Sequence, residues 1–260
     1  MSTHTRAASI FKLRSRQDMS AVKICKLSLY YIIQKGYGFF MINVAIDGPA
    51  GAGKSTVAKA AAKELGYIYV DTGALYRTVA LNAVRNSIID DSEKIVDMLS
   101  STQVELKYVD GVQAVYLNGE DVSSLIRTPE ISMGASKVSA IPEVRAVLLD
   151  LQRDIAKNNN VIMDGRDIAT VVLPDAQVKI FLFASPECRA MRRYKELIEK
   201  GQNVKYEDVL ADVNQRDYQD SHREIAPLKP SEQSVLADTS DCTLDESIAL
   251  IVKIIKENIA

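Results

Sequence analysis

Short apolar runs and helical stretches alternate along the chain from residue 41 onward. Runs of four to eight residues that are rich in Val, Ile and Tyr are typical of buried strands. Strands that alternate with helices favour a parallel sheet covered by helices on both faces. We therefore predict a three-layer α/β fold around a five-stranded parallel sheet, with strands over 42–46, 67–70, 161–163, 178–183 and 234–237.

Capping residues mark the helices between these strands. Proline directly after Thr or Ser predicts a helix start, and Gly predicts a helix end. Thr followed three residues later by Glu predicts a capping box. These signals occur at Thr128-Pro129, Ser185-Pro186, Gly66, Gly201 and Thr243 to Glu246. Acidic or hydroxyl residues follow most of the strands, at the sheet edge where open α/β sheets bind their ligands.

Two stretches interrupt the alternation. Residues 104–117 predict two strands with a turn at Asp110-Gly111, and Asn118-Gly119 predicts a second turn. We therefore expect a small antiparallel sheet inserted into the parallel fold. Residues 186–230 are helical in pattern, highly charged and rich in arginine. A polar helical pair attached to a sheet is typical of a mobile lid.

The charge of the chain is unevenly distributed. Residues 1–40 hold seven Lys or Arg and one acid, whereas the whole chain has a net charge of −2. Such a segment is typical of an organellar transit peptide. It is equally consistent with an upstream extension, disordered or not native, of a protein that begins at Met41, and we favour this second interpretation. A third interpretation is a tail that binds nucleic acid.

Composition argues against several classes of function. The 260 residues are 25% charged and 47% hydrophobic, as in ordinary soluble globular proteins. Three distant cysteines and two histidines argue against a disulfide framework, a zinc site and histidine-based catalysis. The small net charge gives no general attraction to nucleic acid or membranes. We expect a cytoplasmic protein, with neither nucleic-acid nor membrane partners, in which local arginines bind any phosphate.

The run from Gly48 to Thr56 joins the first strand to an alanine-rich helical stretch. It reads Gly48-Pro49-Ala50-Gly51-Ala52-Gly53-Lys54-Ser55-Thr56. This spacing matches the phosphate-binding loop, whose backbone N–H groups and helix N-terminus surround phosphate oxygens. In that pattern Lys54 reaches the β- and γ-phosphates and Ser55 binds Mg²⁺. The alternative is a glycine-rich turn without a ligand. The motif predicts a nucleoside triphosphate site and leaves the reaction open.

Residues after two further strands could form a second site. Thr72 opens the helix after 67–70 and Arg77 lies one turn further along, an arrangement that binds anions. Asp164 follows 161–163, where its carboxylate would reach the water shell of a metal ion. Arg166-Asp167 offers paired donors and acceptors suited to the edge of a base. The alternative for Thr72 and Arg77 is a capped helix with a surface arginine. An isolated Arg-Asp after a strand is more often a structural ion pair.

Arg216 and Arg223 lie seven residues apart, two turns on one face of a predicted helix in the lid. By themselves they would most often form a solvated charged face. Phosphoryl transfer requires two phosphates in line, Mg²⁺ and cations near the developing charge, with little covalent chemistry from the protein. A donor loop, an arginine site for an acceptor and an arginine-bearing lid meet these requirements.

From Met41 onward, over about 220 residues, the chain resembles the bacterial cytidylate kinase family of P-loop nucleoside monophosphate kinases. The motifs that carry the resemblance occur in the family's order, at 48–55, 71–77, 126–128, 141–145, 164–167, 170–175, 178–182 and 226–228. The resemblance implies a P-loop kinase fold and transfer of the γ-phosphoryl group of ATP to CMP or dCMP, with Mg²⁺. It also implies a core over 41–71, 143–185 and 231–260, a monophosphate-binding insert over 72–142 and a lid over 186–230. We expect a monomer, because no feature of the sequence calls for an oligomer.

The resemblance also implies roles for individual side chains. The side chains expected around the acceptor nucleotide are those of Thr72, Arg77, Ser136, Arg145, Arg166, Asp167, Asp220 and Arg223. Those expected at the transferring phosphoryl group are Lys54, Arg216 and Arg223, and Arg192 would contact ATP. The family usually has Ser where this chain has Thr72, which keeps the hydroxyl and adds a methyl group.

Asp167 offers a physical basis for choosing cytosine. Cytosine carries an N4 amino donor where uracil has a carbonyl oxygen, so a buried carboxylate would be left unpaired by uracil. An unpaired buried acceptor costs about 1–3 kcal/mol, enough for about tenfold discrimination. Two alternatives remain open: a kinase for another small acceptor, such as UMP or a shikimate-like metabolite, and a nucleotide-gated binding switch.

Overall fold

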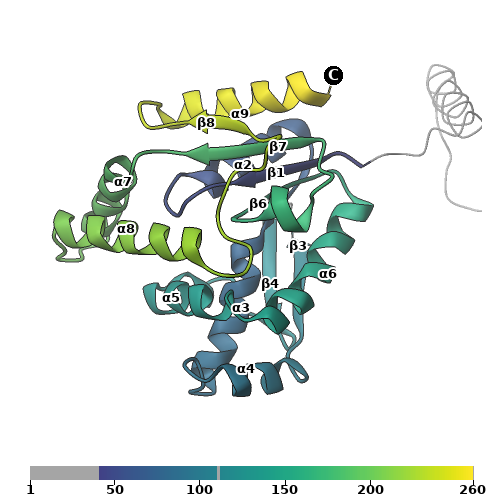
Figure 1. Cartoon of the computed structure of the whole chain (residues 1–260), viewed down its shortest axis with the longest axis vertical. Coiled ribbons are helices and arrows are strands. Elements are labelled where there is room, and N and C mark those ends of the chain that lie inside the picture. Colours follow the sequence, from purple (N-terminus) through teal and green to yellow (C-terminus); the bar gives the residue numbers. More distant parts are fainter. Residues whose placement is uncertain (1–40, 110–111, 260) are drawn as a thin grey trace, which may run out of the picture. The chain divides into compact units, whose positions relative to one another are not determined.

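A five-stranded parallel sheet forms the centre of the protein (Figure 1). The computed structural model describes residues 41–109 and 112–259. The sheet has the strand order β2 (Ile68–Asp71), β6 (Val161–Gly165), β1 (Asn43–Asp47), β7 (Val178–Phe183) and β8 (Val235–Asp238). All five predicted strands are confirmed. The N-terminal extension and the turn at Asp110-Gly111 lie outside the described residues.

Helices cover both faces of this sheet. Alternate residues of a strand point to opposite faces. Val44 and Ile46 therefore pack with α2 (Lys54–Leu65) and α9 (Leu244–Ile259). Ala45 lies in a second core with α6 (Pro142–Asn158) and η2 (Ile168–Val172) on the opposite face. The prediction of a three-layer α/β fold is confirmed.

A third core lies beside the central sheet. It brings together α3 (Thr72–Arg85), α4 (Ser92–Leu99), η1 (Leu125–Arg127), α5 (Pro129–Val138) and one end of α6. The predicted antiparallel sheet is present as β3 (Val104–Val109), β4 (Val112–Leu117) and β5 (Glu120–Asp121). Asn118 and Gly119 have φ values of 50° and 85°, as the two central residues of a type I′ hairpin turn require.

The small sheet packs against the edge strand β2. The side chain of Gln113 accepts a hydrogen bond from the backbone N–H of Asp71 at 2.8 Å and donates to its carbonyl oxygen at 3.4 Å. The hydroxyl of Tyr108 donates to the carbonyl oxygen of Tyr69 at 3.1 Å. These bonds place the end of β2, and with it the start of α3, beside the inserted sheet.

The predicted lid is a pair of helices, α7 (Pro186–Glu199) and α8 (Tyr206–His222), which lie side by side in Figure 1. Ala190 and Leu197 of α7 pack against Val209 of α8 in a small apolar cluster of their own. Gly201 follows α7 with a φ of 74°, so the predicted helix end is confirmed. The pair therefore folds as a unit attached to the carboxyl end of β7.

The predicted helix caps are confirmed. Thr128 accepts a hydrogen bond from the N–H of Ile131 at 3.2 Å, and Ser185 accepts one from Cys188 at 3.1 Å. Thr243 and Glu246 cap each other reciprocally, as a capping box requires. Gly66 closes α2 in the left-handed conformation. Among the described residues, no helix combines the length and the apolar character needed to cross a membrane.

Candidate functional site

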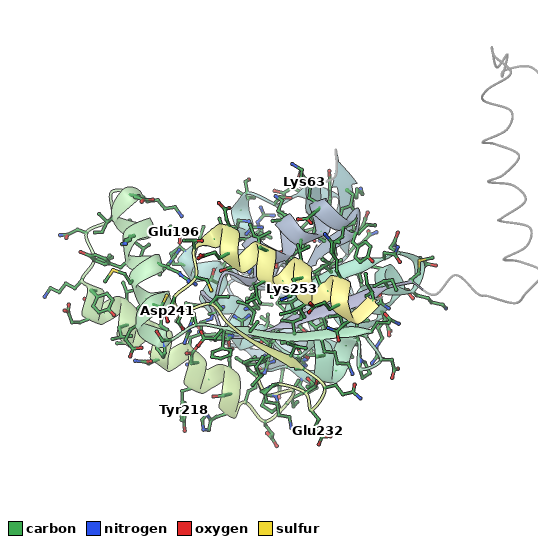
Figure 2. The ribbon with its side chains drawn as sticks, turned by 90° about the horizontal axis from the view of Figure 1, so that it is seen from above. Lys63, Glu196, Tyr218, Glu232, Asp241 and Lys253 are labelled. Carbon is green, nitrogen blue, oxygen red and sulfur yellow. The ribbon has the colours of Figure 1, made fainter. Side chains whose placement is uncertain are left out.

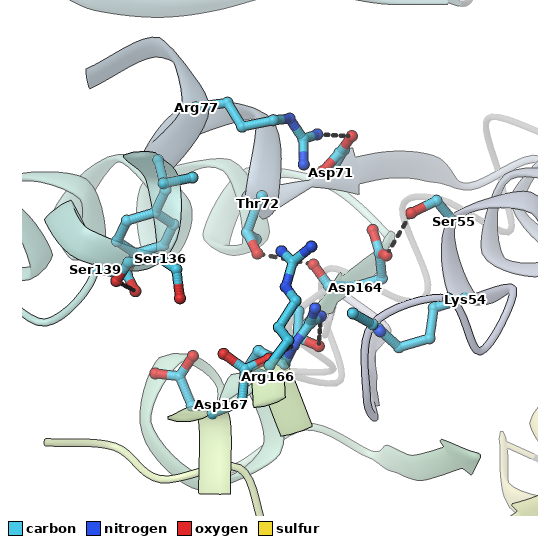
Figure 3. A pocket seen from close by; sticks show the side chains of 18 of the residues that line it. Lys54, Ser55, Asp71, Thr72, Arg77, Ser136, Ser139, Asp164, Arg166 and Asp167 are labelled. Atoms are coloured by element: carbon cyan, nitrogen blue, oxygen red, sulfur yellow. Dashed lines mark hydrogen bonds and ion pairs between the residues drawn. The ribbon is translucent and has the colours of Figure 1, made fainter. Parts of the chain in front are cut away.

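A cavity of about 370 Å³ opens at the carboxyl ends of β1, β2 and β6, where α8 closes one side of it. Figure 3 shows side chains from these separate segments converging on the same space. The lining residues are Ala50, Gly51, Gly53, Lys54, Ser55, Thr56, Asp71, Thr72, Gly73, Tyr76, Arg77, Ala135, Ser136, Ser139, Arg145, Asp164, Gly165, Arg166, Asp167, Arg216, Asp220 and Arg223.

The loop between β1 and α2 depends on its glycines. Gly48, Gly51 and Gly53 have φ values of 148°, 75° and 85°, a region that other residues rarely adopt. A Cβ at Gly48 would also collide with the carbonyl oxygen of Leu182 in β7. Three of the residues expected to bind the donor, Gly48, Pro49 and Ala52, do not line the cavity. They contribute to the conformation of the loop and not to the cavity wall.

Lys54 is held by its own loop. Its ammonium group donates to the carbonyl oxygens of Gly48 at 2.7 Å and Pro49 at 2.8 Å. The pKa of Lys54 is lowered to about 7, mainly by burial and secondly by the neighbouring charge of Arg166. An anion beside this ammonium group would favour its charged form. The site therefore offers a buried cation that gains from the arrival of phosphate.

Asp164 joins α2 to the sheet. The hydroxyl of Ser55 donates to one carboxylate oxygen at 2.9 Å, and the hydroxyl of Tyr69 donates to the other at 2.9 Å. Burial and then the charge of Asp71 raise the pKa of Asp164 to about 6. A hydroxyl and a buried carboxylate at this distance provide the oxygen ligands that suit Mg²⁺ in proteins. The tyrosine was not a sequence-level candidate.

The start of α3 is organised by Asp71. This residue caps the helix by accepting from the N–H of Ala74 at 2.9 Å, and it pairs with Arg77 at 2.8 Å and with Arg127 at 3.4 Å. The hydroxyl of Thr72 donates to the carbonyl oxygen of Asp164 at 2.8 Å. Thr72 and Arg77 therefore both line the cavity wall, with the arginine paired to a carboxylate, and their role as an anion site stays a prediction.

Asp167 lies among arginines from two elements. It is 4% exposed, forms a buried ion pair with Arg145 of α6, and lies 3.8 Å from Arg223 at the end of α8. Ala226, with a φ of 50°, accepts from Arg223 Nε at 2.6 Å. The strained turn after α8 thus holds Arg223 toward the carboxylate. Tyr76 completes this wall, with the Arg145 guanidinium 5.8 Å from its ring centre.

Arg166 and Arg216 differ in how they are paired. Arg166 forms an ion pair with Asp220 of α8 at 2.7 Å. Arg216 makes no ion pair with the described residues, and its Nε is buried without a hydrogen-bond partner. Burial, followed by the charge of Arg166, lowers the pKa of Arg216. A partly buried guanidinium whose Nε has no partner is suited to bind an anionic ligand at a cavity wall.

The cavity carries an excess of positive charge. Six basic side chains and four carboxylates line it, although the whole chain has a net charge of −2. A cluster of this sign in a concave site attracts anions. Its volume and polarity suit phosphorylated small molecules better than apolar ligands.

The structure brings most of the predicted site residues together. The expected loop residues Ala50, Gly51, Gly53, Lys54, Ser55 and Thr56 line the cavity, as do Thr72, Arg77, Ser136, Arg145, Asp164, Arg166, Asp167, Arg216, Asp220 and Arg223. Arg192 does not line it, because its guanidinium donates to the carbonyl oxygen of Thr239 at 2.7 Å. Sequence reasoning missed Tyr76 and Ser139, which lie within four residues of predicted positions.

Comparison with known proteins gives a consistent picture. The family model for cytidylate kinase matches residues 44–257. The chain is 51% identical over 225 residues to a cytidylate kinase from Lactobacillus gasseri, which covers 86% of this chain and 97% of that protein. It is 52% identical over 218 residues to a cytidylate kinase from Caldanaerobacter subterraneus, which covers 84% of this chain and 96% of that protein. A solved shikimate kinase from Bacteroides thetaiotaomicron is 14% identical, covers 84% of this chain and 98% of that chain, and superposes with a TM-score of 0.42, too distant to bear on the acceptor.

Proposed function

This chain belongs to the cytidylate kinase family, and on that premise we propose that it transfers the γ-phosphoryl group of ATP to CMP or dCMP. The products are ADP and CDP or dCDP. The observation that carries the proposal is the two-sided cavity, with a phosphate-binding loop on one side and an arginine-rich wall around Asp167 on the other. A protein that bound the donor alone would not need the arginine-rich wall around Asp167.

The donor is ATP, bound by the loop from Gly48 to Thr56. The loop N–H groups and the N-terminus of α2 favour phosphate oxygens at this position. Lys54 then exchanges its bonds to the loop carbonyls for bonds to phosphate. Ser55 and, through water, Asp164 would hold Mg²⁺, which would compensate the charge of the phosphate groups.

The acceptor monophosphate occupies the opposite wall. Arg77 and Arg145 face its phosphate, and Thr72 contacts the nucleotide. Ser136, Arg166 and Asp167 face the cytosine ring, and Asp220 faces the pentose. Asp167 selects cytosine by accepting from its N4 amino group. Because Arg145 pairs with this carboxylate in the structure, binding of cytosine to Asp167 would rearrange that pair.

The chemical step depends on position and charge. Arg216 has a buried donor without a partner, so it gains a bond when the transferring phosphoryl group arrives beside it. Arg223, held near Asp167 in the free protein, is the second lid cation that approaches this group. Cations that strengthen their bonds as charge develops lower the barrier directly. The residues need no histidine base for this chemistry.

The predicted division of the chain into core, insert and lid fits this reaction. Residues 72–142 form the acceptor-binding insert, residues 186–230 form the lid, and 41–71, 143–185 and 231–260 form the core. Closure of the lid excludes water, which would otherwise compete as the acceptor. We place the protein in the cytoplasm, in pyrimidine nucleotide metabolism, as a monomer that acts on free nucleotides and binds neither nucleic acid nor membranes.

The test is ADP release measured with a panel of acceptors. We expect CMP and dCMP to give kcat/KM values at least about tenfold above that of UMP, and shikimate to give only the rate seen without acceptor. Comparable kcat/KM values for UMP and CMP would refute the choice of cytosine. Slow ATP hydrolysis that no acceptor changes would instead favour a nucleotide-gated switch.

A further inference from the structure

Arg189, which is buried, and Asp217, which is partly exposed, form a junction beside the phosphate-binding loop, although neither residue lines the cavity. Arg189, in the first turn of α7, is 2% exposed. Its guanidinium donates to the carbonyl oxygen of Ala184 after β7 at 2.9 Å and to that of Ala50 in the loop at 3.0 Å. It also donates to both carboxylate oxygens of Asp217 in α8. One side chain thus joins the sheet, the loop and the second lid helix.

The contact with Ala50 fixes a peptide plane of the loop. The carbonyl of Ala50 and the N–H of Gly51 belong to the same planar trans peptide, so they point in opposite directions. Because Arg189 holds the carbonyl oxygen, the N–H of Gly51 is directed away from α7. The backbone of Gly51 also packs against Arg189, whose Cβ would lie 3.5 Å from an added Cβ at this glycine. Arg189 therefore sets the orientation of one loop amide.

The contact with Asp217 fixes the rotation of α8 about its axis. Residues one position apart in a helix point about 100° apart. Anchoring Asp217 therefore determines where Arg216 points. It also determines where Asp220 points, because Asp220 lies one turn further along the same face as Asp217. Both of these neighbours line the cavity. A bidentate pair between guanidinium and carboxylate restricts orientation more strongly than a single hydrogen bond.

The junction is not needed to join the two lid helices to each other. Ala190, Leu197 and Val209 already form an apolar cluster between α7 and α8. What the ion pair adds is a connection from α8 to the loop, since the same guanidinium holds Asp217 and Ala50.

We propose that the Arg189–Asp217 pair is a positioning device that couples the phosphate-binding loop to α8. It orients the N–H of Gly51 and the side chain of Arg216 toward the same phosphate chain. Through it, binding of ATP to the loop also affects the lid. This inference rests on the proposed function in one respect, namely that the loop holds ATP. Neither Arg189 nor Asp217 contacts the substrate in this account.

Asp217→Asn tests the coupling with little change of size. The side chain of Asp217 is 26% exposed, so the substitution leaves no deeply buried cavity. We expect kcat per ATP-binding site to fall about 10- to 100-fold, as for other small misplacements of reacting groups, while KM for CMP stays within about threefold. Binding sites are counted by calorimetric titration with a non-hydrolysable ATP analogue and Mg²⁺, so unfolded protein does not contribute.

Glu196→Gln is the matched control, because it also converts a carboxylate of the lid to an amide. Glu196 lies on α7, is labelled in Figure 2, and pairs with Arg193 and Lys200 at the surface. We expect its kcat per site to stay within about twofold of the unsubstituted protein, as for most exposed ion pairs. Arg189→Lys combined with Asp217→Asn should lose no more activity than the more damaged single variant, because the two residues act as one unit.

Hydrogen exchange gives the readout that a merely structural role would not change. In the unsubstituted protein, the ATP analogue alone should slow amide exchange in α8. In Asp217→Asn, the analogue should still bind and this slowing should be lost. Retained slowing, or a kcat per site within about twofold of the unsubstituted protein, would overturn the coupling. Failure of the unsubstituted protein to bind the analogue would instead overturn the assignment of the loop to ATP.

Discussion

Asp167→Asn removes one negative charge from the wall of the cavity and keeps the shape of the side chain. The Asp167 side chain is 6% exposed and the Arg145 side chain that it pairs with is 10% exposed. Breaking a buried ion pair by removing one partner costs about 3–5 kcal/mol. The amide keeps an oxygen acceptor, and Arg145 also donates to the carbonyl oxygen of Ser139 at 3.4 Å. We therefore expect a loss of about 2 kcal/mol in the free energy of unfolding.

Asp167→Asn should weaken the use of CMP more than it weakens the binding of ATP. A hydrogen bond from cytosine N4 to a charged acceptor contributes about 1.5–3 kcal/mol, which corresponds to about a 10- to 100-fold loss in kcat/KM for CMP. The Asn amide can donate to the O4 carbonyl of uracil, so the preference for CMP over UMP should fall by at least the same factor. Lys54 and the loop are untouched, so the dissociation constant of the ATP analogue should change less than about twofold.

The assay combines ADP release for CMP and UMP with calorimetric titration of the ATP analogue, at a temperature where urea unfolding shows the variant to be folded. The reasoning is refuted if CMP turnover and ATP binding weaken by equal factors. That result would assign Asp167 to a purely structural ion pair with Arg145.

Two further predictions concern the cavity, and a third concerns Asp47 at the end of β1. Lys54→Ala should lower kcat at least about 10³-fold by removing the cation beside the donor phosphates, and a loss of only a few-fold would contradict the loop assignment. Arg216→Ala should lower kcat about 10²-fold and leave urea stability unchanged or raise it by about 1 kcal/mol, because it removes a partly buried cation whose Nε has no hydrogen-bond partner. Burial raises the pKa of Asp47 from 3.8 to about 6, so the folded state binds its proton more tightly than the unfolded state does. Its contribution to the free energy of unfolding is therefore present at low pH and lost as the pH rises toward 6, so Asp47→Asn should remove about 2 kcal/mol of this decline between pH 4 and 7 in urea titrations.

The sequence predicted the parts of the fold that local pattern determines. The five strands, the helix caps and the Asn118-Gly119 turn each depend on residues close together in the chain, and each is confirmed. The location of the site could also be predicted, because parallel strands bring their carboxyl ends to one edge. Asp71 ends β2, Asp164 is the penultimate residue of the neighbouring β6, and the two lie directly opposite each other in the register.

Side-chain partners could not be predicted in the same way. Arg145 and Asp167 are 22 residues apart and meet because α6 packs against η2, which begins directly after Asp167. Arg192 belongs to the predicted lid, but its rotation on α7 directs it to Thr239 and away from the cavity. Arg189 was visible in the sequence only as one of several lid arginines, and its role depends on a carbonyl 139 positions earlier. Such contacts follow from helix packing, which the local pattern does not encode.

The most direct test of the central claim is identification of the phosphorylated product. The purified protein is incubated with equal concentrations of ATP and CMP in the presence of Mg²⁺, and the nucleotides are followed by ³¹P NMR. We predict that CDP and ADP appear at equal rates and in equal amounts, with little inorganic phosphate. Release of ADP and inorganic phosphate while CMP stays unchanged would contradict phosphoryl transfer to CMP.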